Sequence, residues 1–169
     1  MTFLQRIARL RVTLGFLASV VAIWLARPTD RTLAAGAAVA LAGEAMRVWA
    51  AGHLEKGREV TTSGPYAFTR HPLYLGSTLI GIGLAIGSAS WVVGALVAAY
   101  FGLTLTAAIR TEEAHLTEKF GTAYPDYRKG RSAGERRHFS LTRAMRNREY
   151  RAVTGLAIVL GVLLWKART

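Results

Sequence analysis

The sequence predicts an all-α polytopic membrane protein: one domain with about five transmembrane helices and a cytoplasmic N-terminus. Of its 169 residues, 51% are hydrophobic, yet the formal net charge is +12. The two properties are segregated, because long uncharged apolar runs alternate with basic segments, as in membrane proteins whose basic residues gather on the cytoplasmic side. A soluble nucleic-acid-binding domain would explain the charge but not several near-spanning apolar runs, so no nucleic-acid partner is expected.

The first two apolar runs predict a helical hairpin over residues 10–51. They cover residues 12–26 and 33–51 and are separated by a short polar turn. The second run contains Glu44 and Arg47, which are three residues apart and therefore on one helix face. Charges at that depth are costly and usually face the protein interior or a cavity. The two residues are therefore either a structural ion pair near the membrane edge or part of a pocket wall.

Residues 73–109 predict two further spans, at 73–89 and 91–109. The first of them is rich in glycine, at Gly76, Gly81, Gly83 and Gly87. The spacing superficially resembles a dinucleotide-binding fingerprint, but no strand precedes it, and close packing of apolar helices explains it better. A last apolar helix is expected at 151–166. Because it is short, it is either a tilted marginal span or a helix packed on the others.

Two polar segments, 52–72 and 110–150, are expected at the cytoplasmic face. With the N-terminus inside, 17 of the 22 Lys and Arg residues are cytoplasmic, including Arg6, Arg9 and Arg11, and four are on the other side. This bias sets the orientation. It also places both polar segments on one face of the membrane, as a shared site requires.

The densest group of functional residue types lies before the third apolar run. Gly64-Pro65 predicts a turn, and Pro72 fits the first turn of a helix but not its middle. A helix should therefore begin at Pro72. Its N-terminus offers free amides and a partial positive charge, which can bind a carboxylate or phosphate. The side chains around it belong to Tyr66, Arg70, His71 and Tyr74.

Two separated segments together resemble the isoprenylcysteine carboxyl methyltransferase and phospholipid methyltransferase superfamily. The matching residues are Gly64-Pro65-Tyr66, Arg70-His71-Pro72-Leu73-Tyr74-Leu75-Gly76, Glu112-Glu113-Ala114-His115-Leu116 and Phe120-Gly121-Thr122-Ala123-Tyr124-Pro125-Asp126-Tyr127. The resemblance covers about the second half of the chain. It implies an integral membrane enzyme that moves a methyl group from S-adenosylmethionine to a lipophilic acceptor entering from the bilayer, with S-adenosylhomocysteine as product. The acceptor is an isoprenylcysteine-like carboxylate, a lipid amine or another lipid.

The resemblance also implies a set of cofactor-binding residues, namely Val60, Thr61, Tyr66, His71, Pro72, Leu73, Tyr74 and Glu112. The amides of Leu73 and Tyr74 are expected to hold the carboxylate of the cofactor's methionine part. Glu112 is expected to accept hydrogen bonds from ribose hydroxyls or from the amino group. Because adjacent helical residues point about 100° apart, Glu113 is not expected to share that role.

The catalytic prediction consists of Arg110 and Glu113. Relatives that methylate a carboxylate have an arginine where this chain has Ala108, and Arg110 is the nearest arginine. The chain also lacks the family's proline-rich stretch after Tyr127. Both departures count against a carboxylate acceptor. An amine acceptor needs a proton acceptor, and Glu113 is the candidate by reach.

Several alternatives remain open on the sequence alone. The aromatic residues Phe120, Tyr124 and Tyr127 either line the site or pack a cytoplasmic helix against the bundle. Some membrane sterol reductases share the C-terminal motif region and use NADPH, although they are longer chains. A non-catalytic lipid-binding membrane protein would use the basic segment for anionic lipids. No metal site is predicted, because the chain has no cysteine and Glu112-x-x-His115 matches only half of a carboxylate di-metal motif.

Overall fold

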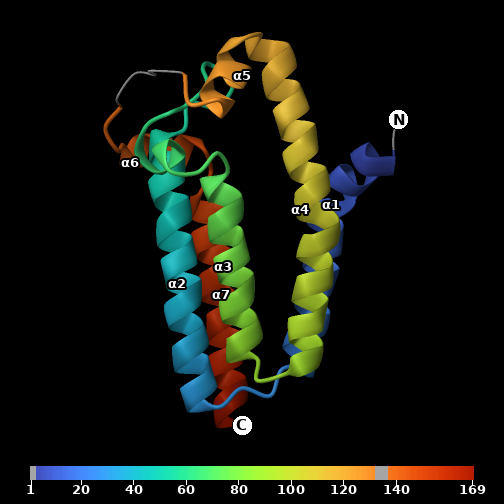
Figure 1. Ribbon diagram of the computed structural model, residues 1–169. Helices are drawn as coiled ribbons and strands as arrows, with labels where there is room; N and C mark the ends of the chain where they lie inside the picture. The colour runs from blue at the N-terminus through green and yellow to red at the C-terminus, as the bar shows by residue number, and fades with distance from the viewer. Residues whose placement is uncertain (1–2, 132–136) are drawn as a thin grey trace.

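All regular structure in the described part of the chain is helical, which confirms the predicted class (Figure 1). The computed structural model describes residues 3–131 and 137–169, without the side chains of 3–12 and 14. Arg6, Arg9 and Arg11, which support the predicted orientation, therefore lie outside the described side chains. The helices are α1 (Phe3–Leu25), α2 (Asp30–His53), η1 (Gly64–Ala67), α3 (Pro72–Gly87), α4 (Trp91–Phe120), α5 (Ala123–Arg128), α6 (Leu141–Arg146) and α7 (Tyr150–Arg168).

Three of the described helices, α2, α4 and α7, are long and apolar enough to cross a membrane. The Gly15–Leu25 part of α1 and the whole of α3 are also apolar, but shorter. At a rise of about 1.5 Å per residue, α3 is about 24 Å long and α4 about 45 Å. The hydrocarbon core of a bilayer is about 30 Å thick. Helix α4 therefore continues beyond the apolar zone, and its C-terminal turns can reach the polar segments.

Helices α2 and α3 pack with their backbones in close contact, because glycines meet at the crossing. A Cβ atom added to Gly43 would lie 2.6 Å from the carbonyl oxygen of Gly76, and one added to Gly83 would lie 2.5 Å from that of Gly36. Small residues permit this approach between apolar helices. The packing interpretation of the glycine-rich run is thus confirmed, and the first turns of α3 are fixed to α2.

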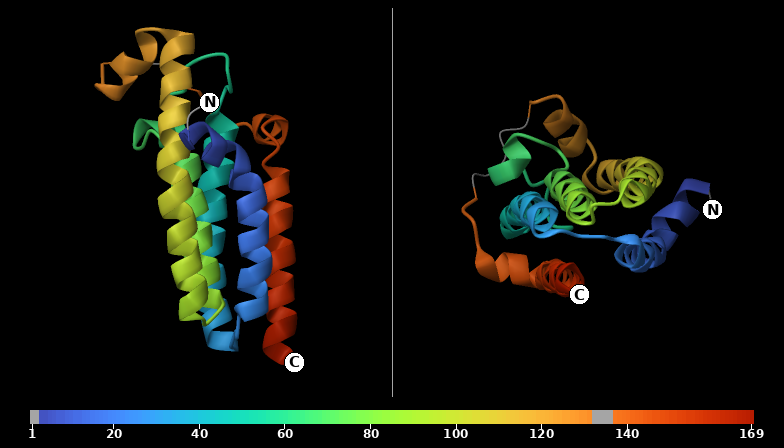
Figure 2. Two further views of the ribbon diagram at one scale, coloured as in Figure 1. Left: turned by 90° about the vertical axis from the view of Figure 1, so that its right-hand side faces the viewer. Right: turned by 90° about the horizontal axis from the view of Figure 1, so that it is seen from below.

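Helix α1 packs mainly against α4 and touches α7, whereas α2 packs against α3, α6 and α7 (Figure 2). The hairpin expected over residues 10–51 is therefore not a directly packed pair. The face of α2 that carries its glycines is occupied by α3, which leaves α1 to pair elsewhere. The short turn between α1 and α2 is held by a hydrogen bond from the Arg27 amide to the Ser88 carbonyl at 2.7 Å.

The polar segments before α3 and after α4 gather at one end of the bundle (Figure 1). Helix α6 is fastened there to the C-terminal end of α2. Arg143 and Arg146 donate to the carboxylate of Glu55 at 2.7–2.9 Å. The side-chain amide of Asn147 donates to the carbonyls of Ala51 and Leu54 at 2.8 Å. These contacts bring the start of α7 next to the end of α2.

The attachment of α6 should depend on pH through Glu55. The hydrogen bond from Arg143 and the charge of Arg146 hold the pKa of Glu55 below its ordinary value. A carboxylate with a lowered pKa stabilises the fold above its unfolded-state pKa of about 4.3, and this stabilisation is lost as pH falls through the folded-state value. We expect Glu55→Gln to lower the thermal unfolding midpoint in detergent by a constant amount above about pH 5. The difference from wild type should then shrink toward zero in stronger acid, and a difference that persists there would contradict this account.

Candidate functional site

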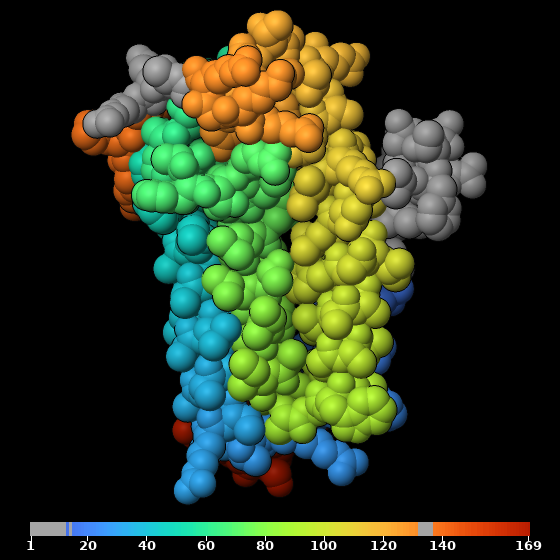
Figure 3. Space-filling model, in the orientation of Figure 1, coloured from blue at the N-terminus to red at the C-terminus, as the bar shows by residue number. Residues whose placement is uncertain are grey.

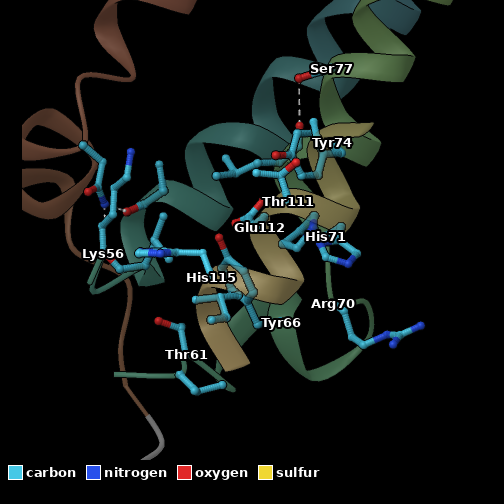
Figure 4. Close-up of a pocket in the computed structure, with 18 of the residues that line it drawn as sticks. Lys56, Thr61, Tyr66, Arg70, His71, Tyr74, Ser77, Thr111, Glu112 and His115 are labelled. Atoms are coloured by element: carbon cyan, nitrogen blue, oxygen red, sulfur yellow. Dashed lines mark hydrogen bonds between the residues drawn. The ribbon is translucent and has the colours of Figure 1, made fainter. Parts of the chain in front are cut away.

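A cavity of about 1240 Å³ lies at the end of the bundle where the polar segments meet. Its wall includes all eight residues expected to contact a cofactor: Val60, Thr61, Tyr66, His71, Pro72, Leu73, Tyr74 and Glu112. Figure 4 shows Tyr66, Tyr74 and Glu112, from η1, α3 and α4, facing a common space. Toward the apolar zone the cavity continues between α3 and α4, where the space-filling view shows a crevice (Figure 3).

The turn before α3 is shaped by Gly64. Its φ of +60° lies in the left-handed region that favours glycine. An added Cβ atom would also lie 2.6 Å from the His53 ring. The turn leads into η1, where Tyr66 is buried and its carbonyl accepts a 2.6 Å hydrogen bond from the Tyr127 hydroxyl. The two sequence motifs are thus joined directly at this turn.

Helix α3 begins at Pro72, as the sequence predicts. The Tyr74 amide, however, donates to the His71 carbonyl at 3.1 Å. Among the described residues, the Leu73 amide has no acceptor. The helix start therefore offers the Leu73 amide for a ligand carboxylate, whereas the Tyr74 amide closes the first turn.

The cavity-facing positions of α4 follow helical spacing. They are Tyr100, Phe101, Thr104, Leu105, Ala108, Thr111, Glu112, His115, Leu116, Lys119 and Phe120. Steps of three or four residues keep side chains on one face. Arg110 and Glu113 are out of this phase and do not line the cavity; Arg110 is exposed. Neither of the two residues expected to be catalytic is therefore part of the cavity wall, although Glu113 contacts His71, one of the eight, from outside it.

Glu113 instead connects three parts of the structure around the mouth of the cavity. Its Oε1 lies 3.2 Å from His71 Nε2, accepts from the Tyr124 hydroxyl at 3.1 Å and lies 3.5 Å from the Arg70 guanidinium. Burial and the negative charge of Glu113 raise the pKa of Tyr124 above its usual range, so the phenol remains protonated and can donate. Glu113 thus ties the loop before α3 to α4 and α5.

Arg47 occupies the inner wall of the cavity. Its guanidinium lies 2.7 Å from Glu149 Oε1, and it donates to the Ser77 hydroxyl at 2.5 Å and to the Leu73 carbonyl at 3.4 Å. Glu44 is also an ion-pair partner, at 3.8 Å, but lies outside the lining. Both interpretations of the Glu44 and Arg47 pair therefore hold in part: Arg47 forms the cavity wall, and Glu44 balances it from behind.

Sequence reasoning missed several lining residues, above all Ser77, Asn147 and Glu149. Ser77 is five residues after Pro72, one helical turn beyond Leu73, and the phase of α3 could have indicated it. Glu149 lies at the start of α7, about a hundred residues after its partner Arg47. No local spacing connects residues that far apart. The aromatic residues Phe120, Tyr124 and Tyr127 all line the cavity, and the hydroxyls of Tyr124 and Tyr127 also donate to Glu113 and to the Tyr66 carbonyl.

Three known proteins are similar to parts of this chain. The cobalt-zinc-cadmium resistance protein CzcN of Cupriavidus metallidurans is 40% identical over 76 residues, which are 44% of this chain and 35% of that protein. The nickel-cobalt-cadmium resistance protein NccN of Alcaligenes xylosoxydans xylosoxydans is 35% identical over 83 residues, 48% of this chain and 38% of that protein. The protein-S-isoprenylcysteine O-methyltransferase of Schizosaccharomyces pombe is 32% identical over 92 residues, 54% of this chain and 39% of that protein.

The chain matches between 35% and 39% of the length of these relatives. No solved structure matches it. The sequence pattern of the phospholipid methyltransferase family matches residues 10–123, about two thirds of the chain. This stretch includes α2, α3, α4 and most of the cavity lining. The chain therefore belongs to the phospholipid methyltransferase family.

Proposed function

We propose that the protein is a multi-pass membrane methyltransferase that moves a methyl group from S-adenosylmethionine to a lipophilic acceptor at the cytoplasmic face. The observation that carries the proposal is the cavity, in which both motif segments form one wall. Family membership and the similarity to an isoprenylcysteine methyltransferase support methyl transfer. The volume of about 1240 Å³ exceeds the roughly 300–1,000 Å³ of a typical small-molecule site, which favours room for both donor and acceptor.

The residues of the cavity fit the donor's functional groups. The Leu73 amide and the positive end of α3 suit the carboxylate of the methionine part. The carboxylate of Glu112 suits ribose hydroxyls, and Val60, Thr61 and Tyr66 supply the adjoining wall. When bound, S-adenosylmethionine supplies an electrophilic methyl group on its sulfonium. The protein's contribution is to hold the two reactants in line and to exclude water.

The acceptor is proposed to enter from the bilayer through the crevice between α3 and α4. The side chains there are largely apolar or aromatic, including Tyr100, Phe101 and Leu105. Ala108, 4% exposed, faces the cavity at the position where carboxylate-methylating relatives have an arginine. The wall of α4 thus has no basic group for a carboxylate at that point, which favours a neutral or amine acceptor.

Glu113 is proposed to position residues 70–71 rather than to accept a proton. Its carboxylate already contacts His71, Arg70 and Tyr124 and does not line the cavity. Arg110, exposed and out of phase with Glu112, is given no role in the reaction. An amine acceptor would therefore have to release its proton to another group or to water.

The proposed function predicts selective stabilisation by the reaction product. A ligand that binds only the folded state raises its stability by an amount that grows with the logarithm of the ligand concentration relative to Kd. We expect S-adenosylhomocysteine to raise the thermal unfolding midpoint of the purified protein and NADPH to leave it unchanged. Stabilisation by NADPH alone would indicate a reductase, and stabilisation by neither would favour a non-catalytic lipid-binding protein.

The acceptor can be identified directly. Incubation with S-adenosylmethionine carrying a labelled methyl group and a total lipid extract should transfer label into a lipid fraction. Mass analysis of the labelled product then identifies the acceptor and the methylated atom. Absence of label in every lipid fraction, with an active control enzyme in the same extract, would contradict the proposed acceptor class.

A further inference from the structure

Two acidic side chains, one in the inner wall of the cavity and one behind it, lie beside a single basic side chain. The carboxylates of Glu44 and Glu149 both lie beside the guanidinium of Arg47. The side chains of the two glutamates are only 8% exposed, and that of Arg47 is 20% exposed. When both carboxylates are ionised, two acidic groups around one basic group leave one negative charge in excess. A buried charge without compensation is unfavourable, so a ligand that supplies a positive charge would be stabilised there.

The hydrogen-bonding capacity of these carboxylates is also unfilled. Neither oxygen of Glu44 has a hydrogen-bond donor among the described residues. The Oε1 atom of Glu149 lies 2.7 Å from the Arg47 guanidinium, but this contact does not have hydrogen-bond geometry, and the atom has no other described donor. Buried polar atoms in proteins nearly always have a partner. Of the two residues, only Glu149 borders the cavity, so it is the one beside space that a ligand can occupy.

The surroundings place Glu149 near the donor-binding end of the cavity. Arg47, its partner, also donates to the Leu73 carbonyl at the start of α3. Tyr66, Glu112 and Glu149 all line the cavity. Burial, and then the negative charges of Glu112, Tyr127 and Glu149, raise the pKa of the Tyr66 hydroxyl above its usual range. Glu149 is therefore on the same side of the cavity as the residues proposed to bind the methyl donor.

We propose that Glu149 binds the ammonium group of a ligand in this cavity. The inference rests on the proposed function and extends it to α7, which lies outside the family-matched residues 10–123. An ammonium group donates up to three hydrogen bonds and supplies the missing positive charge. It can come from the amino-acid part of the methyl donor, whose carboxylate would then lie at the Leu73 amide, or from an amine acceptor.

Binding of two nucleosides distinguishes whether the ammonium group comes from the methyl donor or from an amine acceptor. S-adenosylhomocysteine carries the amino-acid part, and 5′-methylthioadenosine has the same adenosine and thioether without it. If Glu149 binds the donor's ammonium, Glu149→Gln should weaken S-adenosylhomocysteine binding at least about tenfold, the size expected for one charged hydrogen bond, and leave methylthioadenosine binding unchanged. Glu149→Asp keeps the charge and should lose less. Glu118→Gln, an exposed carboxylate on α4 outside the cavity lining, is the matched control and should change neither affinity.

Hexylammonium tests the second source of the ammonium group, an amine acceptor. If Glu149 binds an acceptor amine, hexylammonium should stabilise the wild type more than hexanol does, and Glu149→Gln should remove this difference. The same variant should bind both nucleosides as tightly as the wild type does. Equal weakening of both nucleosides would overturn the inference, because Glu149 would then only maintain the cavity's shape. No change with either nucleoside or with hexylammonium would overturn it as well. If the wild type binds neither nucleoside, the proposed function is contradicted, and Glu149 cannot bind the ammonium of the methyl donor. The hexylammonium measurement then tests the inference alone.

If Glu149→Gln does not yield folded protein, the same comparison is made with Glu149→Asp. The shorter side chain withdraws the carboxylate by about one methylene while the charge stays in the wall. A selective loss of S-adenosylhomocysteine over methylthioadenosine, or a selective loss of hexylammonium, supports the inference. An equal loss of the two nucleosides overturns it in this variant too.

Discussion

Gly83→Leu should prevent α2 and α3 from packing and should strongly destabilise the bundle. An added Cβ atom at this position meets the Gly36 carbonyl oxygen and the Ala40 amide nitrogen at 2.5 Å, and both are backbone atoms that no rotamer change can move. Overpacking a well-packed site typically costs about 1–3 kcal/mol, and backbone contact places this site at the upper end or beyond it. We expect little monodisperse protein in detergent and a strongly lowered unfolding midpoint.

The matched control is Gly102→Leu on α4. An added Cβ atom there meets nothing within 4 Å, so a leucine projects into open space and should cost little. The packing also fixes the site, because Leu73 and Ser77 of α3 are held by Arg47 of α2. Any Gly83 variant that still folds should therefore bind S-adenosylhomocysteine poorly. Equal stability of the two leucine variants would show that the α2 and α3 crossing is not a close contact.

The helices could be predicted from the sequence, but not all of their neighbours. Apolar runs identify α2, α4 and α7, and the glycines of α3 indicate a close partner. They do not say which helix pairs with α1, because lipid is as apolar as the side chains of the runs and packing there depends on shape. The expectation that consecutive runs pair as a hairpin therefore differs from the contacts of α1 with α4.

The residues of the candidate site that could be predicted from the sequence are those whose positions depend on local geometry. The eight expected residues lie on the cavity wall because a turn, a proline-started helix and a helical phase each act over a few residues. The phase of α4 also separates Arg110 from Glu112, since a two-residue step turns about 200° around the axis. Glu149 could not be predicted, because its position depends on how α6 is fastened to α2 through Glu55 and Asn147.

The adjacent glutamates of α4 should respond in opposite ways to substitution. Glu112 lines the cavity and makes no hydrogen bond or ion pair with any described residue, whereas Glu113 contacts His71, Tyr124 and Arg70. Glu112→Gln should leave the unfolding midpoint of the ligand-free protein unchanged. It should lower kcat/KM for methyl transfer by about 10- to 150-fold, the equivalent of the 1.5–3 kcal/mol assigned to a hydrogen bond with a charged group.

Glu113→Ala should have the opposite effects: it should lower the stability of the ligand-free protein more than it weakens donor binding. It leaves His71 and the Tyr124 hydroxyl without their acceptor, so the ligand-free protein should lose about 1–3 kcal/mol of stability. Donor binding should weaken only as far as the loop before α3 loosens, and excess S-adenosylhomocysteine should recover part of the lost unfolding midpoint. Unfolding midpoints with and without S-adenosylhomocysteine, measured beside the methyl-transfer rates of both variants, make the comparison. A different outcome would assign Glu113 a chemical role: a Glu113→Ala protein that is as stable as the wild type and binds the donor normally, yet transfers no methyl group. In that case only a proton acceptor would have been lost, because structure and donor affinity would be unchanged.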